Sequence, residues 1–209
     1  MESTSAAPTE TPTRLWAGTT LDERRTFRST ALLDAALDQI GESGSAAVTV
    51  RSLCRQTGLN DRYFYESFAN RDDLLAQLYR RTAEAVQTEL LTETTDIEHD
   101  RQAWARAVVE RFVAMMVDDP RKARLLLVEP MVEPILGGIG LATVPVFTRM
   151  IRTTLPKDAT KTERTLTAVT AVGALSAVLG GWFSGKLDVT REELVEHCAR
   201  VLLRGRTDE

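Results

Sequence analysis

TVRSLCRQTGLNDRYFYESF, residues 49–68, is the stretch of sequence that decides the fold. Apolar residues recur at helical spacing on both sides of the link TGLN at 57–60. Thr49 and Asn60 are residue types that cap helix N-termini, so each predicts the start of a helix. Gly58 supplies the left-handed backbone conformation that a tight turn requires. The stretch therefore predicts two short helices joined by a turn, which is a helix-turn-helix.

The side chains of this stretch divide into a buried set and an exposed set. Leu53, Leu59 and Phe64 are expected to face the small core that holds the two helices at a steep angle. The last six residues include four aromatic side chains, and so short a helix cannot bury all of them. We therefore expect Phe64 and Phe68 to be core residues and at least one tyrosine to face outward.

Helical periodicity continues through the chain and predicts an all-α protein of about nine helices without strands. Residues 1–20 are rich in Ser, Thr, Ala and Pro, which predicts a disordered tail. Residues 21–69 are assigned to the helix-turn-helix domain, with the motif itself at 49–68. Residues 70–209 are assigned to a second helical domain.

Two expectations concern helix boundaries in this second domain. Gly137, Gly138 and Gly140 are predicted to form a loose connection before a helix that starts near Val144. Thr160 and Glu163 have the spacing of a capping box, which predicts the start of a long apolar helix.

The long apolar helix raises the question of membrane insertion. Residues 165–185 carry no charge, which approaches the length of a membrane span. Threonine, glycine and serine dilute the segment, and amphipathic helices flank it. We interpret it as a helix buried on most sides rather than as a membrane span.

The bulk composition limits the classes of partner and compartment. The chain has 209 residues and a formal net charge of −4, so a nucleic-acid partner has to be argued from local charge. Cys54 and Cys198 lie far apart, each in a helical pattern, which favours a reducing cytoplasm over a disulfide framework. The N-terminus lacks the pattern of a secretory signal.

Three segments together resemble the DNA-binding domain of the TetR (tetracycline-repressor) family of bacterial regulators. They are LLDAALDQIGESG (32–44), the stretch 49–68 quoted above, and ANRDDLLAQL (69–78). The C-terminal WFSGKLDVTREELVEHCARVLLRG (182–205) and the helical layout are similar more loosely. The resemblance implies a dimeric, ligand-responsive repressor with an all-helical regulatory domain.

In a helix-turn-helix the first helix braces the second, which enters the major groove. Phosphate contacts hold register, whereas contacts to base edges specify sequence. The resemblance places Tyr65 where the family commonly has a phosphate-contacting tyrosine. The expected DNA-contacting residues are Thr49, Arg51, Asn60, Asp61, Arg62, Tyr63, Tyr65, Glu66 and Ser67.

Three of these residues depart from the family pattern. Asp61 stands where a basic or small residue is frequent, Arg62 where glycine is frequent, and Glu66 where an aromatic residue is frequent. Asp61 suits a helix N-terminus but repels phosphate. Glu66 is a residue type that accepts a hydrogen bond from the amino group of cytosine in the major groove.

Three arginines early in the first helix leave two interpretations open. Arg24, Arg25 and Arg28 either contact DNA phosphates or belong to a solvated charged face. Acidic residues further along the same helix show that such a face exists.

Regulation is expected to involve a dimer. Ala168, Ala171, Ala174 and Ala177 allow close helix packing along the long apolar helix, and residues 191–203 would complete a four-helix interface. The alternative for the long helix is the centre of a monomer core. The family resemblance favours the dimer.

The middle helices are expected to enclose a cavity for a small apolar or amphipathic effector, such as a lipid or acyl chain. Binding would swing helix 70–90 and move the DNA-binding domains out of register. Apolar stripes of this kind are more often plain core. The candidate lining residues are Trp104, Val108, Phe112, Met115, Met116, Phe147 and Met150, together with Leu126 and Met131.

Two rival functions were weighed against DNA binding. The sequence has no HExxH, P-loop, GxSxG or CxxC motif, so we expect neither an enzyme nor a bound metal or cofactor. Asp61 and Glu66 keep open a helical interaction scaffold or small-molecule binder that has lost operator binding.

Overall fold

The computed structural model describes residues 20–92, 100–154 and 159–203, and these ranges are all-α, as predicted. The predicted tail lies outside the described residues except for Thr20. Nine α-helices and three further helical segments occur in the described ranges. They are α1 (Leu21–Ser43), η1 (Ser45–Ala47), α2 (Val50–Thr57), α3 (Asp61–Tyr65), α4 (Arg71–Thr92), α5 (Arg101–Asp118), α6 (Pro120–Ala123), the π-helical η2 (Arg124–Val128), the 3-10 helix η3 (Glu129–Met131), α7 (Pro134–Thr154), α8 (Lys161–Phe183) and α9 (Arg191–Leu203).

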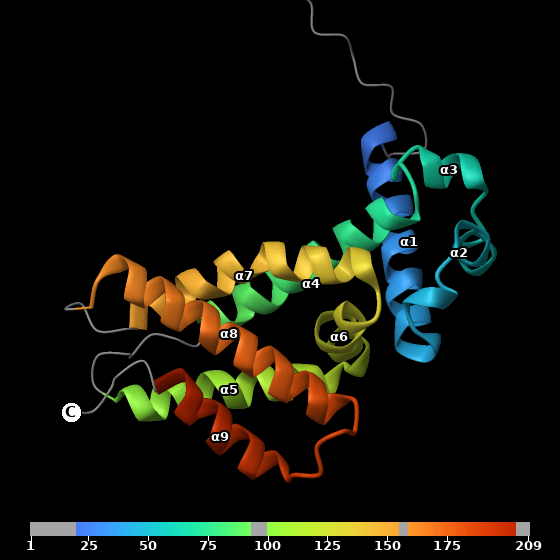
Figure 1. Cartoon of the computed structure of the whole chain (residues 1–209). Coiled ribbons are helices and arrows are strands. Elements are labelled where there is room, and N and C mark those ends of the chain that lie inside the picture. The colour runs from blue at the N-terminus through green and yellow to red at the C-terminus, as the bar shows by residue number, and fades with distance from the viewer. Residues whose placement is uncertain (1–19, 93–99, 155–158, 204–209) are drawn as a thin grey trace, which may run out of the picture.

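The helices form two parts that α4 connects (Figure 1). Helices α1, α2 and α3 lie together at one end of the molecule. Helix α4 runs from that end along the second part, where α5, α7, α8 and α9 form a bundle. The short α6 lies between the bundle and α1, which it contacts.

Two hydrophobic clusters underlie the two parts. Leu53, Phe64 and Phe68 are fully buried in the N-terminal cluster, which confirms that they form its core. Helix α4 contributes to both clusters, because Leu78 packs in the N-terminal one and Leu90 in the bundle. A shift of α4 therefore acts on both parts of the molecule.

Local capping signals start the helices where the sequence indicates. The Thr160 hydroxyl accepts a hydrogen bond from the Glu163 N–H at 3.2 Å, and the Glu163 carboxylate accepts one from the Thr160 N–H at 2.8 Å. This confirms the predicted capping box at the start of α8.

The three glycines at 137–140 do not form the predicted loose connection. They lie inside α7, which starts at Pro134 rather than near Val144. A Cβ added at Gly137 would lie 2.9 Å from the carbonyl oxygen of Pro130, and one at Gly140 would lie 3.3 Å from the Tyr79 hydroxyl. Close packing, rather than a turn, explains the absence of side chains at these two positions.

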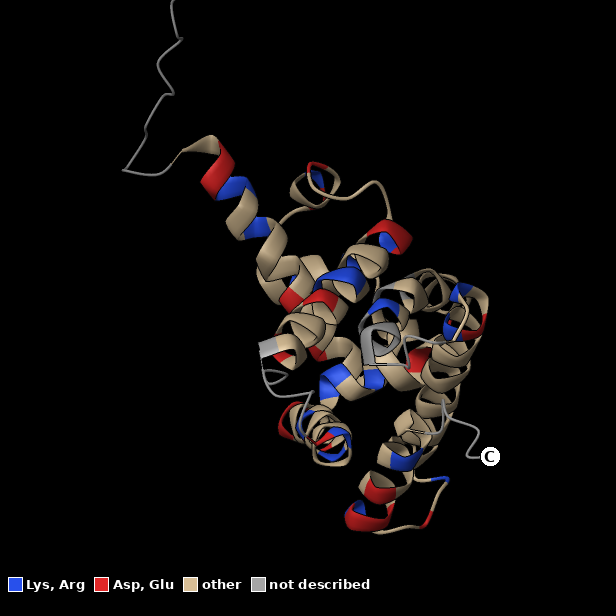
Figure 2. Cartoon of the chain, turned by 90° about the vertical axis from the view of Figure 1, so that its left-hand side faces the viewer, with Lys and Arg blue, Asp and Glu red and all other residues tan. Residues whose placement is uncertain are grey.

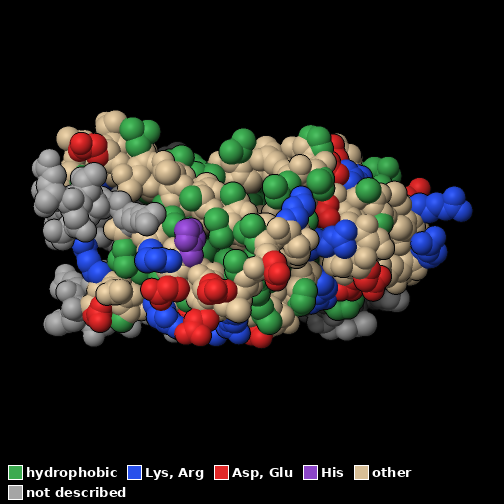
Figure 3. Space-filling view, turned by 60° about the horizontal axis from the view of Figure 1, so that its bottom comes forward, with side chains coloured by type: hydrophobic (Ala, Val, Ile, Leu, Met, Phe, Trp, Pro, Cys, Tyr) green, Lys and Arg blue, Asp and Glu red, His purple; other side chains and the backbone are tan. Residues whose placement is uncertain are grey.

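Helix α8 is less enclosed than predicted. It is long and apolar enough to cross a membrane by length and composition, yet 28% of its most apolar window is buried. The expectation of a helix buried on most sides is therefore wrong. Leu166, Val169 and Gly173 lie on an exposed face, while Ala168 and Ala171 face the core of their own chain. Figure 3 shows hydrophobic side chains spread over one face of the molecule.

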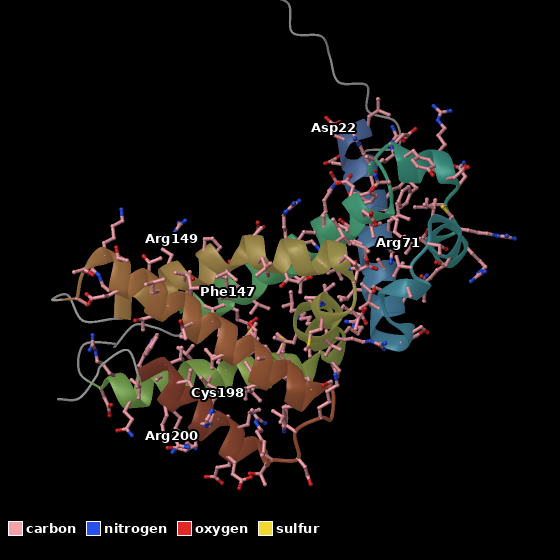
Figure 4. The ribbon with its side chains drawn as sticks, in the orientation of Figure 1. Asp22, Arg71, Phe147, Arg149, Cys198 and Arg200 are labelled. Carbon is pink, nitrogen blue, oxygen red and sulfur yellow. The ribbon has the colours of Figure 1, made fainter. Side chains whose placement is uncertain are left out.

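The buried cysteine on α9 is expected to resist modification. Burial raises the pKa of the Cys198 thiol to about 11, so little thiolate exists at pH 8. Cys198 lies between α9 and its neighbours in the bundle (Figure 4). Labelling by a disulfide reagent should be on the order of 100-fold slower at Cys198 in the folded protein than after denaturation. Equal rates in both states would contradict the burial.

Candidate functional site

The helix-turn-helix is built by local interactions at each boundary. The Thr49 hydroxyl accepts from the Ser52 N–H at 3.0 Å and caps α2. Gly58 ends α2 with a φ of 70°, in the left-handed region. The Asn60 side chain then accepts from the Tyr63 N–H at 3.2 Å and starts α3. These contacts set the angle between α2 and α3 over the core made by Leu53 and Phe64.

Most of the predicted DNA-contacting residues are exposed, on α2 and α3 or at their N-terminal caps. Thr49 and Arg51 are exposed at the start of α2. The side chain of Arg62 is 81% exposed, and Tyr65 is also exposed, as are Asn60 and Asp61. The cluster of tyrosine, arginine and amide groups has the composition of a surface that contacts nucleic acid.

Three of the predicted contact residues are partly withdrawn from the exposed surface. Tyr63 is half-buried, and the guanidinium of Arg28 lies 4.4 Å from its ring centroid. Glu66 is half-buried and forms ion pairs with Arg28 and Arg62. The Ser67 hydroxyl oxygen is buried, so the structure does not place it on the exposed surface.

Two of the three arginines of α1 contact α3 or the residue that ends it. Arg25 donates to the carbonyl oxygen of Glu66, and Arg28 donates to its carboxylate at 3.3 Å. Arg24 donates to the carbonyl oxygen of Thr20 at 3.4 Å. Basic residues follow the acidic first turn of α1 (Figure 2). Sequence reasoning left phosphate contact and a solvated face open, and it did not foresee this packing against α3.

A polar cluster joins η3 to the N-terminal part. The Glu129 carboxylate is buried, with 3% of the residue exposed. It accepts from the Ser45 N–H at 3.0 Å, from the Ser45 hydroxyl at 2.6 Å and from Arg124 Nε at 3.0 Å. Arg124 also donates to the carbonyl oxygen of Gly41 at 3.2 Å. We call Ser45, Arg124 and Glu129 the interdomain latch.

Arg71 reinforces the same junction from the first turn of α4 (Figure 4). It donates to the carbonyl oxygens of Ser45 and Val48, each at 2.8 Å, and to Glu133 at 2.8 Å. The segment that precedes the Thr49 cap is therefore bound by two arginine–glutamate pairs, Arg71–Glu133 and Arg124–Glu129. The sequence analysis identified neither of these two pairs.

The bundle contains an apolar cavity of about 130 Å³ that is partly open to solvent. None of its lining residues is charged. Phe147 contributes from the inner side of α7, whereas Arg149 projects away from the bundle (Figure 4). The lining residues are Tyr79, Ala83, Leu90, Val108, Val109, Phe112, Leu126, Leu127, Gly140, Val144, Phe147, Val172, Leu175, Ser176, Leu179 and Leu202.

The cavity includes part of the predicted lining. Val108, Phe112, Leu126 and Phe147 line it. Three other predicted residues, Trp104, Met115 and Met116, are buried in the core of the bundle and do not line the cavity. The predicted Met131 is exposed, and the side chain of Met150 lies outside the described residues. The contributions of α4 and α8 were missed, because a sequence does not show which helices face each other.

Comparison with known proteins identifies the N-terminal part. Residues 32–78 match the model of the bacterial regulatory proteins of the tetR family. Residues 32–78 thus form a TetR-family DNA-binding domain. This regulator is thus a DNA-binding transcriptional regulator rather than an enzyme, which confirms both expectations. No curated protein matches the sequence.

Solved structures support the same fold for most of the chain. The fatty acid degradation regulator FadR from Bacillus halodurans superposes with a TM-score of 0.65 at 16% identity, over 85% of this chain and 95% of that one. FadR from Bacillus subtilis, in complex with stearoyl-CoA, gives 0.64 at 14% identity, over 85% and 98%. The multidrug binding protein EbrR, complexed with imidazole, gives 0.64 at 17% identity, over 83% and 94%.

Proposed function

We propose that this regulator is a cytoplasmic repressor that binds a palindromic operator as a homodimer and is released by a small apolar or amphipathic effector. The observation that carries the proposal is the exposed surface of α2 and α3 on the same chain as an apolar cavity in the helical bundle. The proposal assigns Thr49, Arg51, Asn60, Arg62 and Tyr65 to the DNA contact.

The exposed face of α8 supports the homodimer. Leu166, Val169, Thr170, Gly173 and Ala177 are exposed at helical spacing, and none is charged. An apolar face with small residues lets a second α8 approach closely. A two-fold dimer would place two α3 helices about one DNA turn apart, near 34–36 Å, as two half-sites require.

The composition of the cavity supports an apolar effector. Its polar lining groups are Tyr79 and Ser176, and an uncharged wall disfavours a buried ion. An apolar cavity of roughly 150 Å³ holds benzene in an engineered protein, so a space of this size suits a small ring or a short chain segment. Two of the similar proteins bind organic ligands, stearoyl-CoA and imidazole, in their crystals.

Two elements connect the cavity to the DNA surface. Helix α4 lines the cavity with Tyr79 and Leu90 and contacts α1 through its first half. The segment η2 lines the cavity with Leu126 and Leu127 and continues into the latch residue Glu129. An effector that separates these walls would favour a state with a different latch geometry. Only unequal affinity for the two states drives such a shift.

Replacing Glu129 with glutamine should weaken the latch. The amide keeps the shape but cannot accept from both the Ser45 N–H and Arg124 Nε, so one buried donor loses its partner. We expect the free energy of unfolding to fall by about 1–3 kcal/mol. Urea denaturation measures this change. Glu110→Gln, which breaks a surface pair with Arg106, is the matched control and should cost about 0.5 kcal/mol or less. Equal losses would contradict a structural role for the latch.

Duplex binding tests the proposed function directly. The purified protein is titrated onto a fragment of its own promoter at several salt concentrations, with and without a panel of fatty acids and uncharged aromatic compounds. Specific binding that weakens steeply with salt, and that at least one compound releases, supports the proposal. A chain that retains no fragment at low salt is instead a scaffold or small-molecule binder.

A further inference from the structure

Glu66 is the point at which arginines from two helices converge. Its Oε1 accepts from Arg62 Nε at 3.2 Å, and its Oε2 accepts from Arg28 Nη2 at 3.3 Å. Its backbone carbonyl accepts from Arg25. Two cations, from α1 and α3, thus flank the half-buried carboxylate, and a third holds the backbone of the same residue at the edge of the exposed α3 surface.

We propose that Glu66 is a positioning residue that fixes which edge of Arg62 meets the DNA and so specifies a guanine at one operator position. The inference rests on the proposed role of α3 as the recognition helix. In this proposal Glu66 acts through Arg62 and does not itself contact a cytosine.

The chemistry of the guanidinium group gives the first step. Arginine carries five N–H donors in a planar fork, and Glu66 occupies the Nε–H of Arg62. The terminal Nη1 and Nη2 groups belong to a side chain that is 81% exposed. Two parallel donors of this kind match the O6 and N7 acceptors of guanine in the major groove. Because Glu66 occupies the Nε–H, Arg62 meets the guanine edge with its terminal Nη1 and Nη2 groups.

The second step is that Glu66 is itself held in place. Arg28, the partner of its other oxygen, has a side chain that is 22% exposed and lies over the Tyr63 ring at 4.4 Å. Tyr63 lies on α3, one residue from Arg62. Arg62, Glu66, Arg28 and Tyr63 thus form a continuous set of contacts between α3 and α1. Rotation of the Glu66 carboxylate would break contacts on both helices.

The third step concerns charge. Without the Glu66 carboxylate, Arg28 and Arg62 would lose their neutralising partner, and Arg62 would be free to adopt other rotamers. A released arginine pairs with whichever phosphate is nearest, and such contacts carry no sequence information. Loss of Glu66 should therefore lower the discrimination between base sequences and raise the affinity for DNA of any sequence.

Selection from a randomised duplex library tests the inference, with wild type, Glu66→Gln, Arg62→Ala and the double variant. We expect both single variants to lose the same guanine preference, roughly 10- to 100-fold, which is the discrimination of one bidentate pair. The double variant should lose no more than Arg62→Ala alone. Glu66→Gln should also add about one phosphate contact. The slope of the logarithm of the binding constant against the logarithm of salt concentration should then change by about −0.9.

Glu42→Gln is the matched control. It removes the same charge from the exposed C-terminal part of α1 and should leave the base preference unchanged. Thermal denaturation of every variant checks the fold.

The inference is overturned if Glu66→Gln loses a cytosine at a position that Arg62→Ala leaves intact, because that pattern indicates a direct base contact. A uniform loss of affinity across all sequences, with a lowered melting temperature, also overturns it. If the wild type itself selects no sequence, the proposed DNA contact of α3 fails and the inference falls with it.

Discussion

Replacement of Phe64 by alanine is expected to lower the free energy of unfolding by about 3–5 kcal/mol, the range for a fully buried phenylalanine. Phe64 is completely inaccessible to solvent and packs against Phe68, with ring centroids 5.5 Å apart. This loss is a large part of the free energy of unfolding of an ordinary domain. Urea denaturation measures it, and DNA binding should fail in parallel, because Phe64 holds α3 against the rest of the motif.

Tyr65→Ala provides the control on the neighbouring residue. Tyr65 is 59% exposed and touches Phe64 edge-on, so its removal should cost about 1 kcal/mol or less. DNA affinity should nevertheless fall, because the hydroxyl lies on the proposed contact surface. Similar destabilisation by the two variants would show that α3 is not anchored through Phe64.

Gly173→Glu is expected to give a folded monomer that binds the operator roughly 10²–10⁴-fold more weakly, because it loses the second DNA-binding module. Nothing lies within 4 Å of a Cβ added at Gly173, so the protomer accommodates the new side chain. Removal of a glycine from a helix interior also favours the helix. A charged side chain on the exposed α8 face should block a second copy. Sedimentation measures the oligomeric state, and titration of the operator duplex measures the affinity.

Gly138→Glu is the matched substitution on α7. A Cβ at Gly138 is equally unobstructed and the residue is also exposed, but it lies on a different helix. This variant should stay dimeric with unchanged DNA affinity. If Gly173→Glu remains a dimer, the α8 face is not the interface. If both variants dissociate, the added charge rather than its position is responsible.

The helix-turn-helix could be predicted from sequence because its determinants act over a few residues. Thr49 and Asn60 accept from N–H groups three residues ahead, and Gly58 provides a single positive φ. The capping box of Thr160 and Glu163 also spans three residues. Contacts this short depend on residue type and spacing alone.

The candidate DNA surface was predicted less completely for a related reason. The exposure of Arg62 and Tyr65 follows from helical periodicity once Phe64 is assigned to the core. The pairing of Glu66 with Arg28 joins residues 38 positions apart, so no local pattern indicates it. The sequence suggested a base-reading carboxylate, and the tertiary contacts suggest a positioning one.

The sequence by itself determined the all-α class, the caps, the turn and the TetR-like DNA-binding domain, because each depends on interactions within a helical turn or on a short motif. Only the tertiary structure decided that Gly137 and Gly140 serve packing inside α7, that part of α8 is exposed, and that Glu129 is buried against Ser45. The last contact joins residues 84 positions apart. Which helix faces meet at such separations depends on the packing of all the helices at once. Local patterns in the sequence do not predict these contacts.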